Sequence, residues 1–251
     1  GAVGLQFLDR TFEAVGEEAF VPRTTTKGLG LFVLEQKSFG NFGLELGARI
    51  DSQSSEPDNG QKVDFNPFSL SAGGSYRFTD EWHMTANLDR AERAPAEEEL
   101  FADGPHLATG SYEIGDADLN EETANQLELG LHFHGDVVEV NLAAYTNRFD
   151  DFIYLDDTGD VEDELPVRQW TQADATFNGF EGEAKIQLSS GPSGVYLLRV
   201  WGDVVNAYLT DGGELPRIAP ARAGVDLYWN SDAWRANIGI AHYFKQDDVP
   251  D

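Results

Sequence analysis

The stretch Phe42-Gly43-Leu44-Glu45-Leu46-Gly47-Ala48-Arg49-Ile50 alternates apolar side chains with small or charged ones. Side chains two residues apart lie on the same face of a β-strand, so this stretch predicts a strand with one apolar and one polar face. The same alternation returns across residues 68–78, 126–134, 180–188 and 222–229. The sequence therefore predicts an all-β protein.

The connections between these segments alternate in length. Short links fall near residues 40–41, 79–81, 135–136, 190–193 and 230–232, and long polar links fall near 15–26, 51–66, 92–121, 150–168 and 210–220. This alternation predicts about eleven antiparallel strands in an up-and-down meander, and no helix. Short turns at one end and long loops at the other are typical of a transmembrane β-barrel.

Strand length and aromatic placement also favour a barrel wall in lipid. Segments of roughly ten residues suit a tilted bilayer crossing, whereas ordinary strands average about five or six. Aromatic side chains flank the short turns, as in the belts found at membrane–water interfaces; they are Phe39, Phe42, Phe78, Trp82, Phe133, Trp229 and Trp234. Soluble sandwiches alternate in the same way, so a secreted all-β carbohydrate-binding or hydrolytic domain is the alternative from another class.

Composition excludes several functions. The 251 residues carry a net charge of −28 and no cysteine. Phosphates repel so acidic a chain, which argues against nucleic-acid binding, and disulfides and thiolate chemistry are excluded. The sequence has no G-x-S-x-G, no H-E-x-x-H, no phosphate-binding loop and no dinucleotide fingerprint, so an enzyme is not expected.

Several motifs resemble those of the TonB-dependent outer-membrane receptors. Arg93-Ala94-Pro95 with Glu99-Leu100-Phe101, and then Gly104-Pro105-His106-Leu107-Ala108-Thr109, resemble the opening of an extracellular loop in that family. Gly16-Glu17-Glu18-Ala19-Phe20-Val21-Pro22 is similar to a mid-barrel loop, and Leu215-Pro216-Arg217-Ile218 to the entry into a late strand. The Gly-Pro-His-x-Ala-Thr form looks most like the zinc-uptake branch, although neighbouring branches share most of it.

The resemblance implies a fold and a set of partners. Such transporters are 22-stranded barrels with a plugged lumen. Residues 1–251 would then be one β-barrel region, a fragment lacking the plug, the first half of the barrel and the last strand, with Asp251 on the long-loop side. The resemblance further implies the bacterial outer membrane, surrounding lipid, and coupling to the TonB–ExbB–ExbD complex through the plug, with no required cofactor. A passive porin or adhesin without TonB coupling is a third possibility.

Acidic residues gather in two of the long links. Residues 92–121 carry nine acids and one base, and residues 150–168 carry eight acids and one base. Acids at a mouth would form an electrostatic funnel that concentrates cations. We assign the funnel to 92–121, through Glu97, Glu98, Glu99 and Asp103. For 150–168 we favour an acidic surface loop that keeps the protein soluble or bridges to lipopolysaccharide through divalent ions.

His106 is the histidine of this acidic link. Without thiolates, zinc takes imidazole nitrogen and carboxylate oxygen, so His106 with Glu113, Asp116 or Asp118 predicts part of a metal site. A solvated loop histidine is the alternative. The expected cargo is zinc or another divalent metal, with a ferric siderophore next, because an acidic mouth disfavours an anionic chelate.

A second histidine group is expected near the short turns. His83, His132 and His134 are predicted to face the lumen there, since the strands that carry them are hairpin neighbours. Metal binding by them is geometrically possible, but we interpret them as polar lumen residues hydrogen-bonded to the plug, because no carboxylate is paired with them in the sequence.

Overall fold

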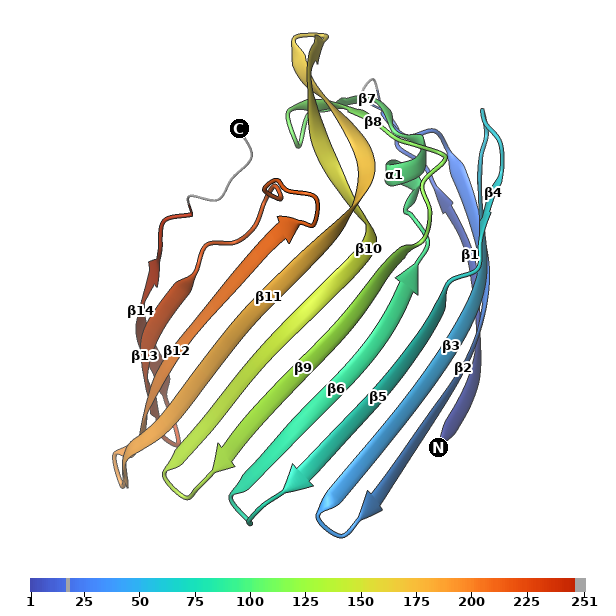
Figure 1. The fold of residues 1–251 in the computed structure, drawn as a ribbon. Coiled ribbons are helices and arrows are strands. Elements are labelled where there is room, and N and C mark those ends of the chain that lie inside the picture. The colour runs from blue at the N-terminus through green and yellow to red at the C-terminus, as the bar shows by residue number, and fades with distance from the viewer. Residues whose placement is uncertain (17–18, 247–251) are drawn as a thin grey trace.

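The computed structural model describes residues 1–16 and 19–246. Glu17 and Glu18 of the quoted Gly16–Pro22 motif, and the C-terminal Asp251, lie outside the described residues. Eleven antiparallel strands follow one another across a single sheet (Figure 1). They are β1 (Ala2–Phe12), β2 (Thr24–Phe39), β3 (Phe42–Pro57), β5 (Phe68–Arg77), β6 (Trp82–Arg93), β9 (Glu122–His134), β10 (Val138–Glu162), β11 (Leu165–Gly191), β12 (Gly194–Leu209), β13 (Arg222–Asn230) and β14 (Arg235–Tyr243).

Four short elements lie off this path. They are β4 (Val63–Phe65), which pairs with β3, the antiparallel pair β7 (Asp103–His106) and β8 (Ser111–Ile114), and the five-residue helix α1 (Glu97–Phe101). Within the described residues, β1 and β14 each pair on one side only, so the sheet is an open curved wall. No helix in the described part of the chain is long and apolar enough to cross a membrane.

The predicted alternation of short and long connections is confirmed, with two corrections. The link expected over 150–168 is instead the continuation of β10 and β11, which stay paired out to Glu162 and Leu165. Asp163 and Glu164 form its turn, both with positive φ. Strand pairing gives the backbone N–H and C=O groups of this polar ribbon hydrogen-bond partners, whereas in a long loop water would have to supply them. The second correction is α1, inside a link expected to lack helix.

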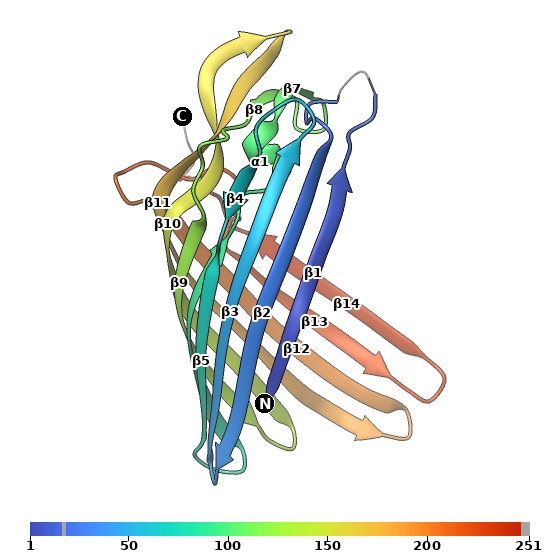
Figure 2. The same cartoon turned by 90° about the vertical axis from the view of Figure 1, so that its right-hand side faces the viewer.

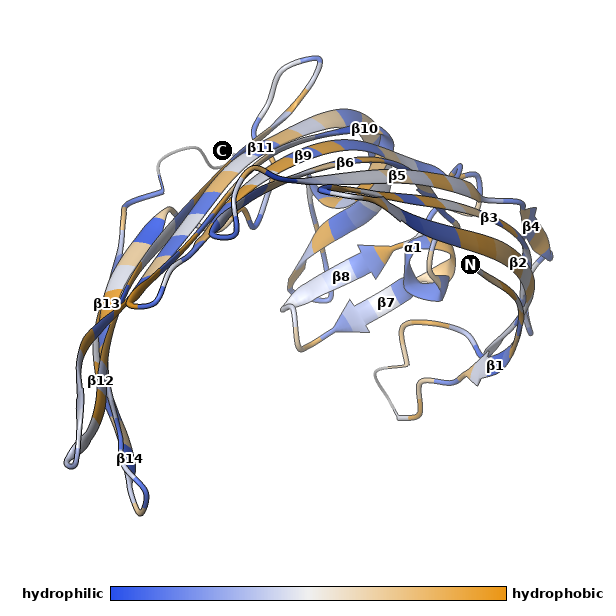
Figure 3. Ribbon diagram, turned by 90° about the horizontal axis from the view of Figure 1, so that it is seen from below, coloured by the Kyte–Doolittle hydropathy of each residue, from blue (hydrophilic) through white to orange (hydrophobic). Residues whose placement is uncertain are grey.

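The two faces of the sheet differ as the alternation predicts. In β9, the three apolar residues Leu127, Leu129 and Leu131 are exposed on one face, while Gln126 and Glu128 point the other way. The register places the apolar sets of neighbouring strands on the same face. The concave face receives α1, β7 and β8, so the apolar face is the convex one (Figure 3). No second sheet covers it among the described residues, which excludes a sandwich core.

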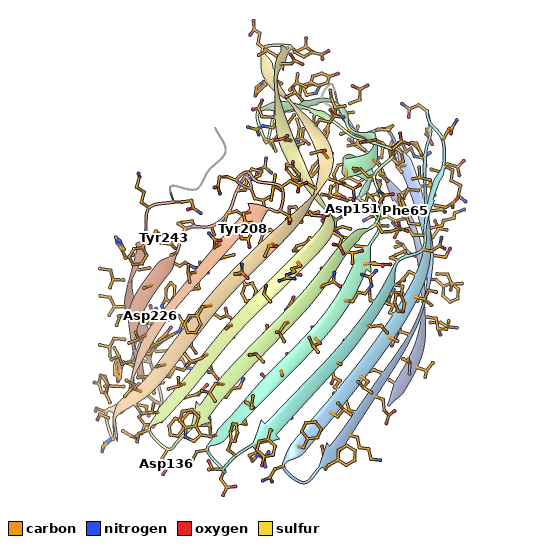
Figure 4. The ribbon with its side chains drawn as sticks, in the orientation of Figure 1. Phe65, Asp136, Asp151, Tyr208, Asp226 and Tyr243 are labelled. Atoms are coloured by element: carbon orange, nitrogen blue, oxygen red, sulfur yellow. The ribbon has the colours of Figure 1, made fainter. Side chains whose placement is uncertain are left out.

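Aromatic side chains gather at the short-turn end, as expected. Trp82 and Phe133 face each other across β6 and β9 with ring centroids 4.8 Å apart. Similar pairs join Phe39 to Phe42 across the β2–β3 turn and Tyr196 to Trp229 across the neighbouring strands β12 and β13. Asp136 marks this end in Figure 4, opposite Asp151 and Phe65 near the long connections. Rings at this level suit a boundary between apolar and wet surroundings.

Candidate functional site

The segment between β6 and β9 folds back over the concave face instead of extending away from the barrel. Figure 2 places α1, β7 and β8 at the same end as the β10–β11 hairpin. β8 pairs in parallel with β11, from Val167 opposite Tyr112, and the Asp103 amide donates to the Phe20 carbonyl at 2.7 Å. The segment is therefore attached to both the middle and the β1 side of the wall.

An apolar cluster anchors this segment. Leu100 of α1 and Leu119 pack against Phe65 and Ile153, and all four side chains are buried. Trp170 of β11 packs at the edge of the cluster. Burial of this kind contributes about 1.5–3 kcal/mol for each large side chain, so the segment has a small core of its own beneath the long connections.

Arg93 links α1 to the start of β9. Its guanidinium donates to both oxygens of Glu99, at 2.7 and 3.0 Å, and to both oxygens of Glu122, at 2.9 and 3.1 Å. Both carboxylates are buried. Glu99 also accepts the Ala96 amide at 2.7 Å, and Glu122 accepts the Ile153 amide at 2.9 Å. A planar guanidinium is suited to such paired contacts.

Glu97 forms a second buried ionic contact, with residues far away in the sequence. Its carboxylate accepts hydrogen bonds from Thr26 Oγ1 and Arg10 Nη2, both at 2.6 Å. Thr26 lies 3.2 Å from Ser55 on the neighbouring strand. Burial alone would raise the pKa of Glu97, but the bonds from Thr26 and Arg10 outweigh it and hold the pKa below its ordinary value.

These contacts reduce the number of acidic residues that can form the predicted cation funnel. Glu97 and Glu99 are buried and paired with arginine, so their charges are largely neutralised at the mouth. Glu98 is partly exposed, and Asp103 is exposed and accepts the Tyr112 hydroxyl at 3.1 Å. Burial first, and then Asp103, raise the pKa of Tyr112. Glu98 and Asp103 are thus the two funnel residues whose carboxylates meet water.

The structure brings His106 and Glu113 together across the β7–β8 pair. His106 Nδ1 donates to Glu113 Oε1 at 3.0 Å, and the same oxygen accepts Thr109 Oγ1 at 2.8 Å and Ser111 Oγ at 3.4 Å. Glu113 is 2% exposed. The Phe20 ring stacks on the imidazole with centroids 4.2 Å apart. His106 is therefore held in one orientation with Glu113 on one side.

The other two predicted ligands lie in a separate turn after β8. The Asp116 amide donates to the Glu99 carbonyl, and the Asp116 carboxylate accepts the Asp118 amide at 2.9 Å. Across residues 1–16 and 19–246, no three His, Asp or Glu side chains converge as a ready metal site. A metal at His106 would need donors beyond the His106–Glu113 pair.

The second histidine group lies on the concave face, as expected from its strands. His83 and His132 are direct cross-strand partners, and their rings stack with centroids 4.5 Å apart. His132 Nδ1 donates to Asn141 Oδ1 at 2.9 Å. His134 Nδ1 lies 3.9 Å from Glu139 Oε2. The sequence did not predict the carboxylate near His134, and the contacts described here lie within the wall, so hydrogen bonding of this group to the plug stays a prediction.

Sequence reasoning missed the residues that hold the site from a distance. Arg10 and Glu97 are 87 residues apart, and no local motif connects them. The resemblance of residues 16–22 to a family loop gives Phe20 no role, although its ring stacks on His106. Only the β-sheet register, which brings β1 and β2 beside α1, makes these contacts visible.

Comparisons with known proteins find matches over most of this chain. The family model described as TonB dependent receptor-like, beta-barrel matches residues 3–251. The chain is 26% identical over 198 residues to the heme/hemopexin utilization protein C of Haemophilus influenzae, covering 70% of this chain and 27% of that protein. It is 23% identical over 202 residues to the rhizobactin receptor of Rhizobium meliloti, covering 76% and 26% respectively.

Among solved structures, the chain resembles the copper transporter OprC with a TM-score of 0.78 and 21% identity, covering 91% of this chain and 36% of that one. It also resembles the FrpB iron transporter from Neisseria meningitidis, with a TM-score of 0.61, 17% identity, and 87% and 33% covered. These likenesses show the fold. The chain spans about a quarter to a third of the proteins it matches.

Proposed function

Because the chain belongs to the TonB-dependent receptor-like β-barrel family, we propose that it forms part of the barrel wall of an uptake receptor in the bacterial outer membrane. The convex apolar face then meets lipid, and the long connections face the exterior. The matched relatives are named as receptors, transporters and utilization proteins, in agreement with a sequence that has no enzyme motif.

The proposed mechanism requires a plug and an energy source. A barrel of 22 strands encloses a lumen that a plug closes, and eleven strands of the size seen here form half of such a wall. The proposed partner of the plug is the TonB–ExbB–ExbD complex, which moves it after capture of the ligand. Ionic contacts on the concave face, such as Arg199 with Asp226 at 3.1 Å, support the proposal of a wet lumen.

We propose a divalent metal, zinc first, as the cargo, with His106 as a ligand. The observation that carries this proposal is the His106–Glu113 hydrogen bond. When Nδ1 of a neutral imidazole donates to a buried carboxylate, the lone pair of Nε2 is free to bind a metal. Zinc-binding histidines are commonly held in this tautomer and orientation by such a carboxylate. Glu113 then positions the ring, and Asp116 and Asp118 remain proposed donors together with groups of the plug.

Zinc titration of the intact receptor in detergent tests this proposal. His106→Ala should weaken zinc binding by about tenfold or more, since one ligand is lost, and Glu113→Gln should weaken it less. His242→Ala is the matched control, because His242 lies on β14 beside Phe244, far from β7. Unchanged affinity in His106→Ala would remove His106 from the site. Zinc uptake that persists without TonB would instead overturn the coupled mechanism.

A second candidate cargo is a ferric chelate. The rhizobactin receptor is among the relatives, and the neutralisation of Glu97 and Glu99 lowers the barrier that acids would present to an anionic chelate. Phe149, Phe152 and Phe177 also form a partly buried aromatic cluster below the long connections. Growth on a panel of ferric siderophores, compared with growth on limiting zinc, distinguishes the two cargoes.

A further inference from the structure

Two arginines lie on the convex face of the wall, where its apolar band ends. Arg90 of β6 and Arg148 of β10 both pair with Asn125 of β9, so the three side chains form one row across the sheet. Along β9, Asn125 shares a face with Leu127 and Leu129. The arginines thus point toward lipid, opposite the lumen and the site described above.

These arginines belong to a shallow groove of about 750 Å³ on that face. Its lining is mainly apolar and includes Val33, Leu70, Leu88 and Leu127, with Arg90, Asn125 and Arg148 at the β10 side. The strands are inclined, so the row rises toward β10 and the arginine end lies nearer the long connections (Figure 1). The groove therefore has an apolar body, with Glu35 at its β2 side and Arg148 at its β10 side.

Arg90 and Arg148 differ in their ionic partners. On β6, Arg90 pairs with Glu92, two residues further on, and on β10 Arg148 is followed two residues later by Asp150. Asp150 accepts a hydrogen bond from Asn125 at 3.3 Å. No ion pair to Arg148 is present among the described residues, and its side chain is exposed. Arg148 is consequently a cation available on the lipid-facing surface.

An unpaired arginine facing lipid is unfavourable at the bilayer midplane by about 2–4 kcal/mol and nearly neutral at the interface. Because the arginines lie at the end of the apolar band, we place them at the membrane–water interface, where the lipid phosphates lie. Guanidinium groups bind phosphate through paired hydrogen bonds. From this arrangement we infer that Arg148, with the Glu92-paired Arg90 as a second cation in the same row, binds the phosphate headgroup of an outer-leaflet lipid whose acyl chain lies along the groove.

This inference rests on the outer-membrane placement proposed above, but not on the metal cargo. The test uses the intact receptor in detergent and bisphosphorylated lipid A as the probe, with dephosphorylated lipid A as the second ligand. Native mass spectrometry counts bound lipid as each is titrated. The variants are Arg148→Gln, Arg90→Gln and the double variant. Arg235→Gln is the control, because it removes the same charge at the short-turn end of β14.

The unaltered receptor should bind the phosphorylated probe about tenfold more tightly than the dephosphorylated one, as expected for one charge-assisted contact. The double variant should lose that difference, and Arg235→Gln should keep it. Equal binding of the two lipids by the unaltered receptor would overturn the headgroup assignment, as would undiminished preference in the double variant. Displacement of the probe by millimolar inorganic phosphate would also overturn it. Absence of the receptor from the outer-membrane fraction would instead refute the proposed function.

Discussion

Replacing Arg93 with alanine should release the segment that covers the concave face while leaving the barrel wall folded. Arg93 makes four hydrogen bonds to Glu99 and Glu122, and both carboxylates are 8% exposed. Removal of the guanidinium leaves two buried carboxylates close together without a cation. Each would then be protonated or would move into water, and movement into water requires α1 to leave its place.

The loss of stability in Arg93→Ala depends on how deeply Arg93 and its two carboxylate partners are buried. Breaking a fully buried ion pair costs about 3–5 kcal/mol. The Arg93 side chain is 43% exposed, so water already screens part of the interaction. An intermediate loss of about 2 kcal/mol is expected, which raises the population of the opened segment about 30-fold.

Hydrogen exchange of the intact receptor measures this opening directly. The reporter amides are Ala102, Gly115 and Asp116, which donate within the segment to Glu98, Ala102 and Glu99. Their exchange should accelerate about 30-fold in Arg93→Ala, and less in Arg93→Lys, which keeps the charge but loses the paired geometry. Unchanged exchange at these amides would refute the reasoning. Equal acceleration in the β9–β10 ladder would show that the wall itself had been destabilised.

Two further predictions concern the same end of the molecule. Since the folded pKa of Glu97 lies below its ordinary value of 4.5, its contribution to stability is full above pH 4.5 and is lost as the pH falls through the folded value. Glu97→Gln should therefore flatten the pH dependence of the stability of the α1 segment below pH 4.5, measured by exchange or proteolysis, and an unchanged profile would contradict this. Leu215 is 2% exposed and packs against Ala175 and Ala207, so Leu215→Ala should lower local stability by about 2–5 kcal/mol. Limited proteolysis should then cut the chain between residues 210 and 221, and the absence of a new cut there would contradict this.

The wall was predictable because its signal is local. Period-two alternation in Phe42–Ile50 is set by strand geometry alone, so the strand, its apolar face and its neighbours' faces follow without any long-range information. The turn chemistry of short links such as Gly40-Asn41 is equally local, and Gly40 indeed has φ of 61°. Eleven strands and their order were therefore within reach of the sequence.

The concave site was only partly predictable because its contacts are long-range. His106 and Glu113 lie seven residues apart on one hairpin, and the sequence identified both. The partners of Glu97 are Arg10 and Thr26, which only the pairing and curvature of the sheet bring near. The many acids of residues 150–168 predict a solvated loop, yet a two-stranded ribbon leaves these side chains equally open to water on both of its faces.

Counting acids overestimates the negative field of a loop whose acids are paired. Residues 92–121 hold nine acids, but two of them, Glu97 and Glu99, face arginine guanidiniums, as does Glu122 just after the segment. The β10–β11 hairpin holds eight acids in residues 150–168, and its tip is exposed. Arg168 approaches only Asp157 there, at 4.0 Å. Field strength at the mouth depends on unpaired, exposed charge, so attraction of cations should arise chiefly from this hairpin, and the segment around α1 should act in holding His106 in place.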